Sequence, residues 1–411
     1  MPVDSNPQGL FALLQAPIAG IVDAAEIIAF LFVVGGAFSI ITKTEAIDLG
    51  IIRIVNVFKG KEFLIIPILF TLFSLGGAVF GMSEEAIAFI AIVVPLILML
   101  GYDSIVAVAI TYFACNIGFT AAMLNPFNVG IGQSIAGIPV YSGIGYRTIV
   151  WIVSTVISIV FIMLYANKIK KNPKSSLVYE IDQKKRENLN IEKTDDNLSL
   201  RHKLILLALA ICMGIVVWGV LVKGFWITEI AAVFLGTGIV AGIIGRLSLD
   251  EIAAAFVQGA KDMITAAMMV GFAKGIVILA ENGNIIDTVL YSLSQLLGNV
   301  SGMFAAYLML PIQMFINFFI SSGSGQAALT MPILAPLGDL IGISRQLTVL
   351  IFQLGDGFSN AIYPTSGVLI ASLGVAKVPY TKWFKWILPL EGILFVLGLV
   401  FITIAKVIGW S

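Results

Sequence analysis

Two acidic residues, Glu84 and Glu85, lie side by side between apolar stretches long enough to enter a membrane. A charge at membrane depth costs at least roughly 2.5–3.5 kcal/mol, so such a residue normally has a partner or a function. The pair could bind an ammonium or guanidinium group of a solute, hold a proton or a sodium ion, or simply reach water at the tip of a hairpin. Asp356 lies in a second apolar stretch and could have any of the same roles.

A Ser/Gly-rich segment, residues 321–326, also interrupts apolar sequence. The first turn of a helix presents free N–H groups and positive partial charge, which suit a carboxylate. Residues 364–367, Pro-Thr-Ser-Gly, predict a second helix start, because proline in a first turn loses no hydrogen bond. We expect these backbones to bind an anionic group, although 321–326 could also be a flexible loop.

Lys274 is the one cation expected deep in an apolar span, residues 263–280. It could pair with Glu84, Glu85 or Asp356, fill a cation site, or neutralise a carboxylate of the substrate. Structural ion pairing is the simpler alternative.

Amide and hydroxyl oxygens near the interrupted stretches are ligands that a small hard cation prefers. Each could equally serve as hydrogen-bonding glue between helices. A possible cation site comprises Asn116, Thr120, Asn128 and Ser359. The candidate substrate-binding residues are Ser83, Glu84, Glu85, Asn116, Asn125, Ser322, Gly323, Ser324, Gln326, Asp356, Asn360, Thr365, Ser366 and Lys274. We expect no cofactor, and either Na⁺ or H⁺ as the coupling ion.

The residue types that catalysis needs are scarce. His202 is the only histidine, and Cys115 and Cys212 lie in separate apolar stretches. A catalytic dyad or a metal site requires clustered ligands, so no enzyme is predicted. The formal net charge is zero, and no basic groove predicts a nucleic-acid partner.

The elements that position these residues are membrane spans. Hydrophobic residues make up 59% of the chain and charged residues 12%, about half the usual charged share. This composition predicts an all-α polytopic membrane protein whose partners are a lipid bilayer and a small-molecule substrate. The expected spans are 27–42, 148–167, 204–222, 227–245, 263–280 and 386–408. Hairpins are expected at 62–100 and 301–342, with broken helices at 104–138, interrupted at Asn125-Pro126, and at 346–374, interrupted near Asp356-Gly357 and Pro364–Gly367.

The two halves of the chain repeat each other. Asp23 and Gly36 match Asp262 and Gly275 at a constant offset, and Gly118-Phe-Thr matches Gly357-Phe-Ser at the same offset. An odd number of crossings separates the copies, which predicts an inverted repeat. We expect a re-entrant hairpin and a broken helix in each half, although hairpin arms that cross the membrane fully would give the same parity. The domains are residues 1–167, the first repeat; 168–203, a linker; and 204–411, the second repeat.

The linker orients the chain. Residues 168–203 carry ten Lys/Arg against six Asp/Glu, which predicts a cytoplasmic position and a bacterial inner-membrane protein. Residues 7–24 match the amphipathic stretch 249–261, but the span 227–245 has no counterpart before residue 7. We therefore expect that a leading helix is missing from the first repeat.

Longer motifs match a known family. They are Ser322-Gly-Ser-Gly-Gln-Ala, Met331-Pro-Ile-Leu-Ala-Pro336, Arg345-Gln346, Phe352-Gln-Leu-Gly-Asp-Gly357 and Pro364-Thr-Ser-Gly367, with Gly81-Met-Ser-Glu-Glu85 and Asn125-Pro126 in the first half. Together they resemble the YfcC-like branch of the C4-dicarboxylate anaerobic carrier (DcuC/ArcD-like) family of the ion transporter superfamily. The resemblance implies a homodimer with a scaffold domain and a moving, elevator-like transport domain that carries the substrate between hairpin tips.

The family label covers dicarboxylates and amino acids alike, so the chemistry of the site must decide the substrate. Carboxylates at the tips favour exchange of basic amino acids resembling arginine and ornithine. The alternative is uptake or exchange of C4-dicarboxylates through Lys274, and a channel is a remote alternative.

Overall fold

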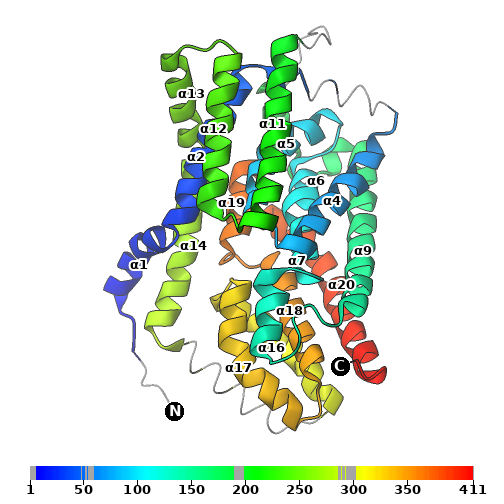
Figure 1. Ribbon diagram of the computed structural model, residues 1–411. Coiled ribbons are helices and arrows are strands. Elements are labelled where there is room, and N and C mark those ends of the chain that lie inside the picture. Colours follow the sequence, from blue (N-terminus) through cyan, green and yellow to red (C-terminus); the bar gives the residue numbers. More distant parts are fainter. Residues whose placement is uncertain are drawn as a thin grey trace.

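The computed structural model describes residues 6–47, 49–50, 53, 60–188, 199–285, 288, 292 and 302–410. Helices make up the regular structure of this part of the chain (Figure 1). In the first half they are α1 (Leu10–Asp23), α2 (Ala25–Lys43), α4 (Ile65–Phe80), α5 (Glu85–Met99), α6 (Ser104–Val108), α7 (Ala114–Thr120), α8 (Ile131–Ile135) and α9 (Ile144–Lys171). Two single-turn π-helices complete the first half. The first, η2 (Ala109–Phe113), joins α6 to α7, and the second, η3 (Pro126–Gly130), precedes α8.

The second half begins with two helices that have no counterpart among the described helices of the first half, and then follows a similar order of elements. Its helices are α11 (Leu200–Trp218), α12 (Ile227–Ile244), α13 (Leu249–Asp262), α14 (Ile264–Asn282), α16 (Gly302–Phe319), α17 (Gly323–Leu340), α18 (Arg345–Asn360), α19 (Gly367–Ala376) and α20 (Tyr380–Val407). The linker helix α10 (Tyr179–Asn188) lies between the halves. Residues 189–198 of the predicted linker and Ser301, the expected start of the second hairpin, lie outside the described residues.

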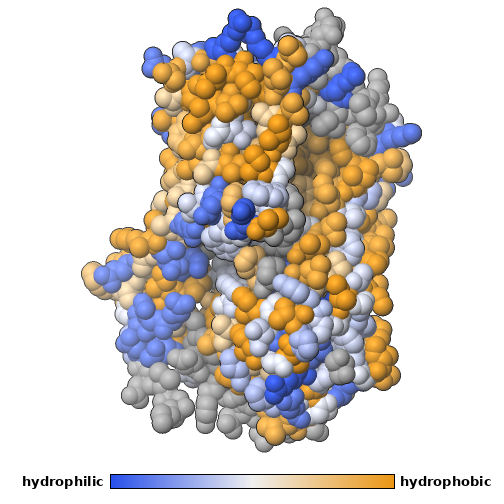
Figure 2. Space-filling view, in the orientation of Figure 1, coloured by the Kyte–Doolittle hydropathy of each residue, from blue (hydrophilic) through white to orange (hydrophobic). Residues whose placement is uncertain are grey.

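Six of the described helices are long and apolar enough to cross a membrane: α2, the segment Glu62–Val79, α9, α12, α16 and α20. The expected spans 204–222 and 263–280 correspond to α11 and α14. Large apolar side chains such as Leu164, Ile243 and Val396 are more than half exposed, and broad hydrophobic areas cover the face seen in Figure 2. Such surfaces suit lipid contact, which confirms an all-α membrane protein.

One group of helices is held together by reciprocal pairing between the halves. Helix α1 packs on α14, and α13 packs on α2, beside α12. A side chain at Gly20 would lie 2.1 Å from the Gly271 carbonyl oxygen, and one at Gly259 would lie 2.2 Å from that of Gly35. Glycine at Gly20 and Gly259 therefore allows the two crossings to pack backbone to backbone.

A second group surrounds two buried helices, α7 and α18. From Gln346 to Ser359, every residue of α18 is buried, and it packs against α7, α16, α17 and α20. The expected interruption near Asp356-Gly357 does not occur, because α18 continues to Asn360 and the chain breaks at 361–366. Gly357 serves close packing instead: a Cβ there would lie 2.2 Å from the Thr120 hydroxyl oxygen. In the first half the break falls at 121–125, as expected.

The linker helix α10 is docked on the start of α6. Asp182 is buried and accepts hydrogen bonds from the Ser104 backbone N–H at 2.7 Å and from its hydroxyl at 2.6 Å. Lys185 forms an ion pair with Asp182 at 2.6 Å, and Arg186 donates to the Tyr102 carbonyl at 2.6 Å. This part of the linker is therefore fixed to the helical body.

Candidate functional site

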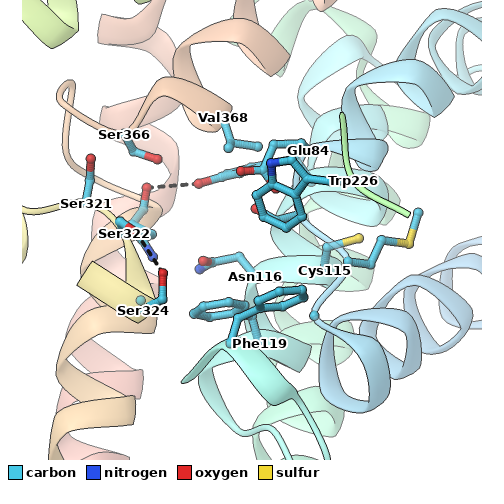
Figure 3. A pocket seen from close by; sticks show the side chains of 17 residues that line it. Glu84, Cys115, Asn116, Phe119, Trp226, Ser321, Ser322, Ser324, Ser366 and Val368 are labelled. Carbon is cyan, nitrogen blue, oxygen red and sulfur yellow. Dashed lines mark hydrogen bonds between the residues drawn. The ribbon is translucent and has the colours of Figure 1, made fainter. Parts of the chain in front are cut away.

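The two hairpin tips meet at a partly open cavity of about 140 Å³. The tip between α4 and α5 and the tip between α16 and α17 face it from different sides, as Figure 3 shows for Glu84 and the serines 321, 322 and 324. The π-helix η2, helix α7 and the break after α18 complete the wall, together with Phe127 and Trp226. The lining residues are Gly81, Met82, Ser83, Glu84, Tyr112, Cys115, Asn116, Phe119, Phe127, Trp226, Ser321, Ser322, Gly323, Ser324, Asn360, Ser366 and Val368.

Local geometry gives the two neighbouring glutamates different positions. Helix α4 ends at Gly81, whose positive φ of 80° suits glycine, and the Met82 N–H returns to the Gly76 carbonyl. Glu85 is buried and accepts the Ser83 N–H at 3.0 Å, so its carboxylate fixes the turn. Glu84 is half-buried and lines the cavity. Of the pair, Glu84 is therefore the one placed to meet a solute.

The second tip is the start of a long helix. Ser322 caps the 18-residue helix α17, its hydroxyl accepting the Gly325 N–H at 3.4 Å. Ser321 donates to the Thr365 carbonyl at 3.0 Å, which joins the tip to the break after α18. Gly323 is required by packing, since a Cβ there would lie 2.6 Å from Phe119 Cζ. The free N–H groups of α17 thus point to the cavity.

A second helix start lies next to the first. Ser366 lines the cavity and caps α19, accepting the Leu369 N–H at 3.5 Å. Helices α17 and α19 both carry no acidic residue in their first turns. Two positive helix ends therefore reach the same cavity, an arrangement that stabilises an anionic group.

The remaining wall is aromatic. The rings of Phe127 and Trp226 lie 5.2 Å apart, and Phe119 and Tyr112 line the same space. The Tyr112 hydroxyl donates to the Asn360 carbonyl at 2.9 Å. No lysine or arginine occurs among the described lining residues. Aromatic faces and the Glu84 carboxylate together suit a cationic group with an apolar stem.

Asp356 lies directly behind the second tip, where its Oδ2 is 3.0 Å from the position a Cβ of Gly323 would take. Its Oδ1 accepts from Asn360 at 3.4 Å, and Asn317 donates to its backbone carbonyl at 2.9 Å. In the described part of the chain, Asp356 Oδ2 and Asn317 Oδ1 are buried without a hydrogen-bond partner. These two oxygens could hold a proton or a small cation.

The four residues of the predicted cation site are engaged with backbone groups. Thr120 donates to the Asn116 carbonyl at 2.6 Å, and Ser359 donates to the Gly355 carbonyl at 2.7 Å. Asn128 donates to the Phe119 carbonyl at 2.7 Å, and Asn116 donates to the Gly357 carbonyl at 2.9 Å. The last bond joins α7 to α18. Their side-chain oxygens retain acceptor capacity, so the cation site stays a prediction.

The structure brings many of the predicted substrate-binding residues to the cavity. Those that line it are Ser83, Glu84, Asn116, Ser322, Gly323, Ser324, Asn360 and Ser366. Those that do not are Glu85, Asn125, Gln326, Asp356, Thr365 and Lys274.

Three of the residues outside the cavity have structural contacts instead. Asn125 donates to the Gly77 carbonyl at 3.3 Å, and Gln326 donates to the side chain of Gln313 at 2.6 Å. Lys274 forms an ion pair with Asp23 at 3.1 Å, between α14 and α1. It therefore pairs with none of the three acidic residues considered from the sequence.

Several lining residues were missed in the sequence. They are apolar, aromatic or small: Gly81, Met82, Tyr112, Cys115, Phe119, Phe127, Trp226 and Val368. Ser321 also lines the cavity, and it belongs to the segment 321–326 whose backbone was expected to bind an anionic group. The match of Gly118-Phe-Thr with Gly357-Phe-Ser, and the motif that contains Gly81 and Met82, were available signals. Trp226 had none, because it precedes α12 and is distant in sequence from both tips.

Comparisons with known proteins agree on a family. The family model for the C4-dicarboxylate anaerobic carrier matches residues 10–407. The Escherichia coli K12 protein YfcC, provisionally named a basic amino acid antiporter, is 45% identical over 97% of this chain and 82% of its own length. An uncharacterized Haemophilus influenzae protein is 32% identical over 98% of this chain and 79% of its own length.

Two solved transporters show a weaker likeness. The YdaH transporter of Alcanivorax borkumensis aligns with a TM-score of 0.47 and 16% identity over 98% of this chain and 90% of its own. MtrF of Neisseria gonorrhoeae aligns with a TM-score of 0.44 and 17% identity over 96% of this chain and 84% of its own. Scores this low do not establish a common fold.

Proposed function

Because the chain belongs to the C4-dicarboxylate anaerobic carrier family, we propose that it exchanges small charged organic solutes, chiefly basic amino acids such as arginine and ornithine. It is a membrane transporter of this family and not an enzyme. The observation that carries the choice of substrate is the charge arrangement of the cavity. Glu84 lies on one side and the N-termini of α17 and α19 on the other.

In the proposed binding mode, the α-carboxylate of the amino acid meets the free N–H groups in the first turns of α17 and α19, which Ser322 and Ser366 cap. The side-chain cation meets Glu84 and the faces of Phe127 and Trp226. A C4-dicarboxylate would place its second carboxylate against Glu84, without a basic residue among the described lining residues to neutralise it. The name of the Escherichia coli relative agrees with the proposal, since basic amino acids are what that name specifies.

The transport step we propose is elevator-like. The helices around α7 and α18 would carry the cavity past the scaffold helices α1, α2 and α11–α14 in a homodimer of the bacterial inner membrane. The similar order of helices in the two halves supports an inverted-repeat construction.

Counterflow in proteoliposomes tests the proposal. Purified protein is reconstituted with unlabelled arginine, ornithine or fumarate inside, and the entry of labelled arginine and, separately, of labelled fumarate is measured. We expect internal arginine and ornithine, but not fumarate, to drive saturable entry. Fumarate-driven fumarate entry with no arginine counterflow would assign the dicarboxylate function instead, and flux that does not saturate would indicate a channel.

A further inference from the structure

Glu391 is a buried acid that the cavity does not use. It lies in the middle of α20, is 3% exposed, and has the buried apolar residues Leu390 and Leu394 near it along the helix. In the part of the chain that the structure describes, neither of its carboxyl oxygens has a hydrogen-bond partner. Its acid group therefore differs from Asp103 and Asp182, whose oxygens accept several bonds.

The neighbouring helix α9 contributes further unpaired polar groups. The Tyr146 hydroxyl donates to the Phe401 carbonyl at 2.6 Å, and the Tyr165 ring lies 5.4 Å from that of Trp386. These contacts set α9 and α20 antiparallel. The hydroxyls of Ser158 and of Ser154, one turn away, are buried and also without a partner among the described residues. Helix α9, which packs on α20, thus also carries buried polar atoms without a partner among the described residues.

Charged and titratable groups around Glu391 are few. Tyr112 and Tyr363 lie within its electrostatic reach, and Tyr112 also lines the cavity. On α18, Asp356 lies at the second tip. Three groups on the packed helices have partners of their own. On α9, Arg147 donates to Gln346 and Gln353, and Tyr165 donates to Asp103; on α16, Tyr307 is bonded to Thr403. The lysines of α9 lie at its C-terminal end, residues 168–171.

Burial decides the charge state of this carboxyl group. An ionised carboxylate in the membrane interior, with neither a cation nor a donor, is destabilised by several kcal/mol, and the group neutralises by taking up a proton. We propose that Glu391 is a proton-binding site of the transport cycle, neutral in this conformation and required in that form for exchange. The step is a simple acid dissociation, in which the O–H bond breaks and water accepts the proton.

Infrared difference spectroscopy tests the protonation directly and needs no substrate. The infrared spectrum of the wild type minus that of Glu391→Gln, both recorded at neutral pH, should show the carbonyl stretch of a protonated carboxyl group. This band should shift in D₂O. Glu281→Gln, which removes an exposed carboxylate at the end of α14, should remove a carboxylate band instead. A carboxylate band in the Glu391 difference overturns the proposal. Should Glu391→Gln fail to fold, Glu391→Asp should move the carbonyl band to a new frequency.

The functional half of the inference rests on the proposed exchange and is tested by the pH dependence of arginine counterflow. With one required proton, the wild-type rate should fall about tenfold per pH unit above the titration point. Glu391→Gln keeps the neutral form, so its counterflow should persist and lose this alkaline decline. An unchanged pH profile, or a folded variant that is inactive at every pH, overturns the inference. Absent arginine counterflow in the wild type would contradict the proposed function and leave the infrared result as the test of protonation.

Discussion

Glu84→Gln is the sharpest test of how the cavity distinguishes its solutes. The change keeps the size of the side chain and removes the one carboxylate among the described lining residues. A hydrogen bond to a charged group contributes about 1.5–3 kcal/mol, which corresponds to roughly 10- to 150-fold in affinity. Glu84 is half-buried, so solvent screening favours the lower end of that range. We expect the half-saturation concentration for arginine to rise roughly 10- to 30-fold.

Citrulline makes the test specific, because it replaces the guanidinium of arginine with a neutral group of nearly the same shape. Competition against labelled arginine is measured for both compounds on the wild type and on Glu84→Gln. Only the arginine affinity should fall, so the preference for arginine should largely disappear. Glu85→Gln is the matched control, since Glu85 binds the Ser83 N–H and does not line the cavity. Equal weakening of arginine and citrulline by Glu84→Gln would refute a contact between Glu84 and the side-chain cation.

Three further changes test other parts of the structure. Gly323→Ala should slow counterflow roughly tenfold or more, because its Cβ would overlap Phe119 Cζ at 2.6 Å, whereas Gly325→Ala, with its nearest contact at 3.4 Å, should not. Lys274→Met should lower the thermal stability by leaving Asp23 unpaired, and adding Asp23→Asn should restore that stability. The half-saturation concentration for arginine should stay within about twofold of the wild type. A large change in that concentration would place Lys274 in the site. Asp182→Asn should remove about 1.5–3 kcal/mol of docking energy from α10 and lower the Tm by several degrees, unlike the exposed Glu180→Gln. An unchanged Tm for Asp182→Asn would show that α10 contributes no stability.

The interrupted apolar stretches coincide with the turns between α4 and α5 and between α16 and α17, and with the break after α7; that the two hairpins are re-entrant stays a prediction. Interrupted apolar stretches with Gly, Ser and Asn are expensive in lipid, so they predict irregular backbone inside protein. The second break was only partly predicted. Gly355 and Gly357 look like helix breakers in sequence, yet they allow α18 to approach Gln313 and Thr120. A glycine required for packing cannot be distinguished from a glycine that ends a helix until its neighbours are known.

The roles of Glu84 and Glu85 could not be separated from sequence either. The two residues are adjacent, yet the Glu85 carboxylate accepts the Ser83 N–H whereas Glu84 lines the cavity. The aromatic wall was hidden for a different reason. Trp226 and Phe127 come from segments about 100 residues apart in the printed sequence, and aromatic residues in an apolar chain are ordinary lipid or core contacts. Glu391 carried no motif, and its significance comes from the absence of partners in the described residues around it.

The two tips, which the proposed repeat makes equivalent, have opposite electrostatic character. Helix α5 begins beside Glu84 and has Glu85 in its first turn, so its positive end is already covered by carboxylates. Helices α17 and α19 begin with Ser/Gly sequence and no acidic residue in their first turns, so their positive ends remain open to a ligand. A solute with one anionic and one cationic group can satisfy both tips at once, whereas a dicarboxylate can satisfy only the second. Under the proposed function, this divergence between the two halves is what orients a basic amino acid in the cavity.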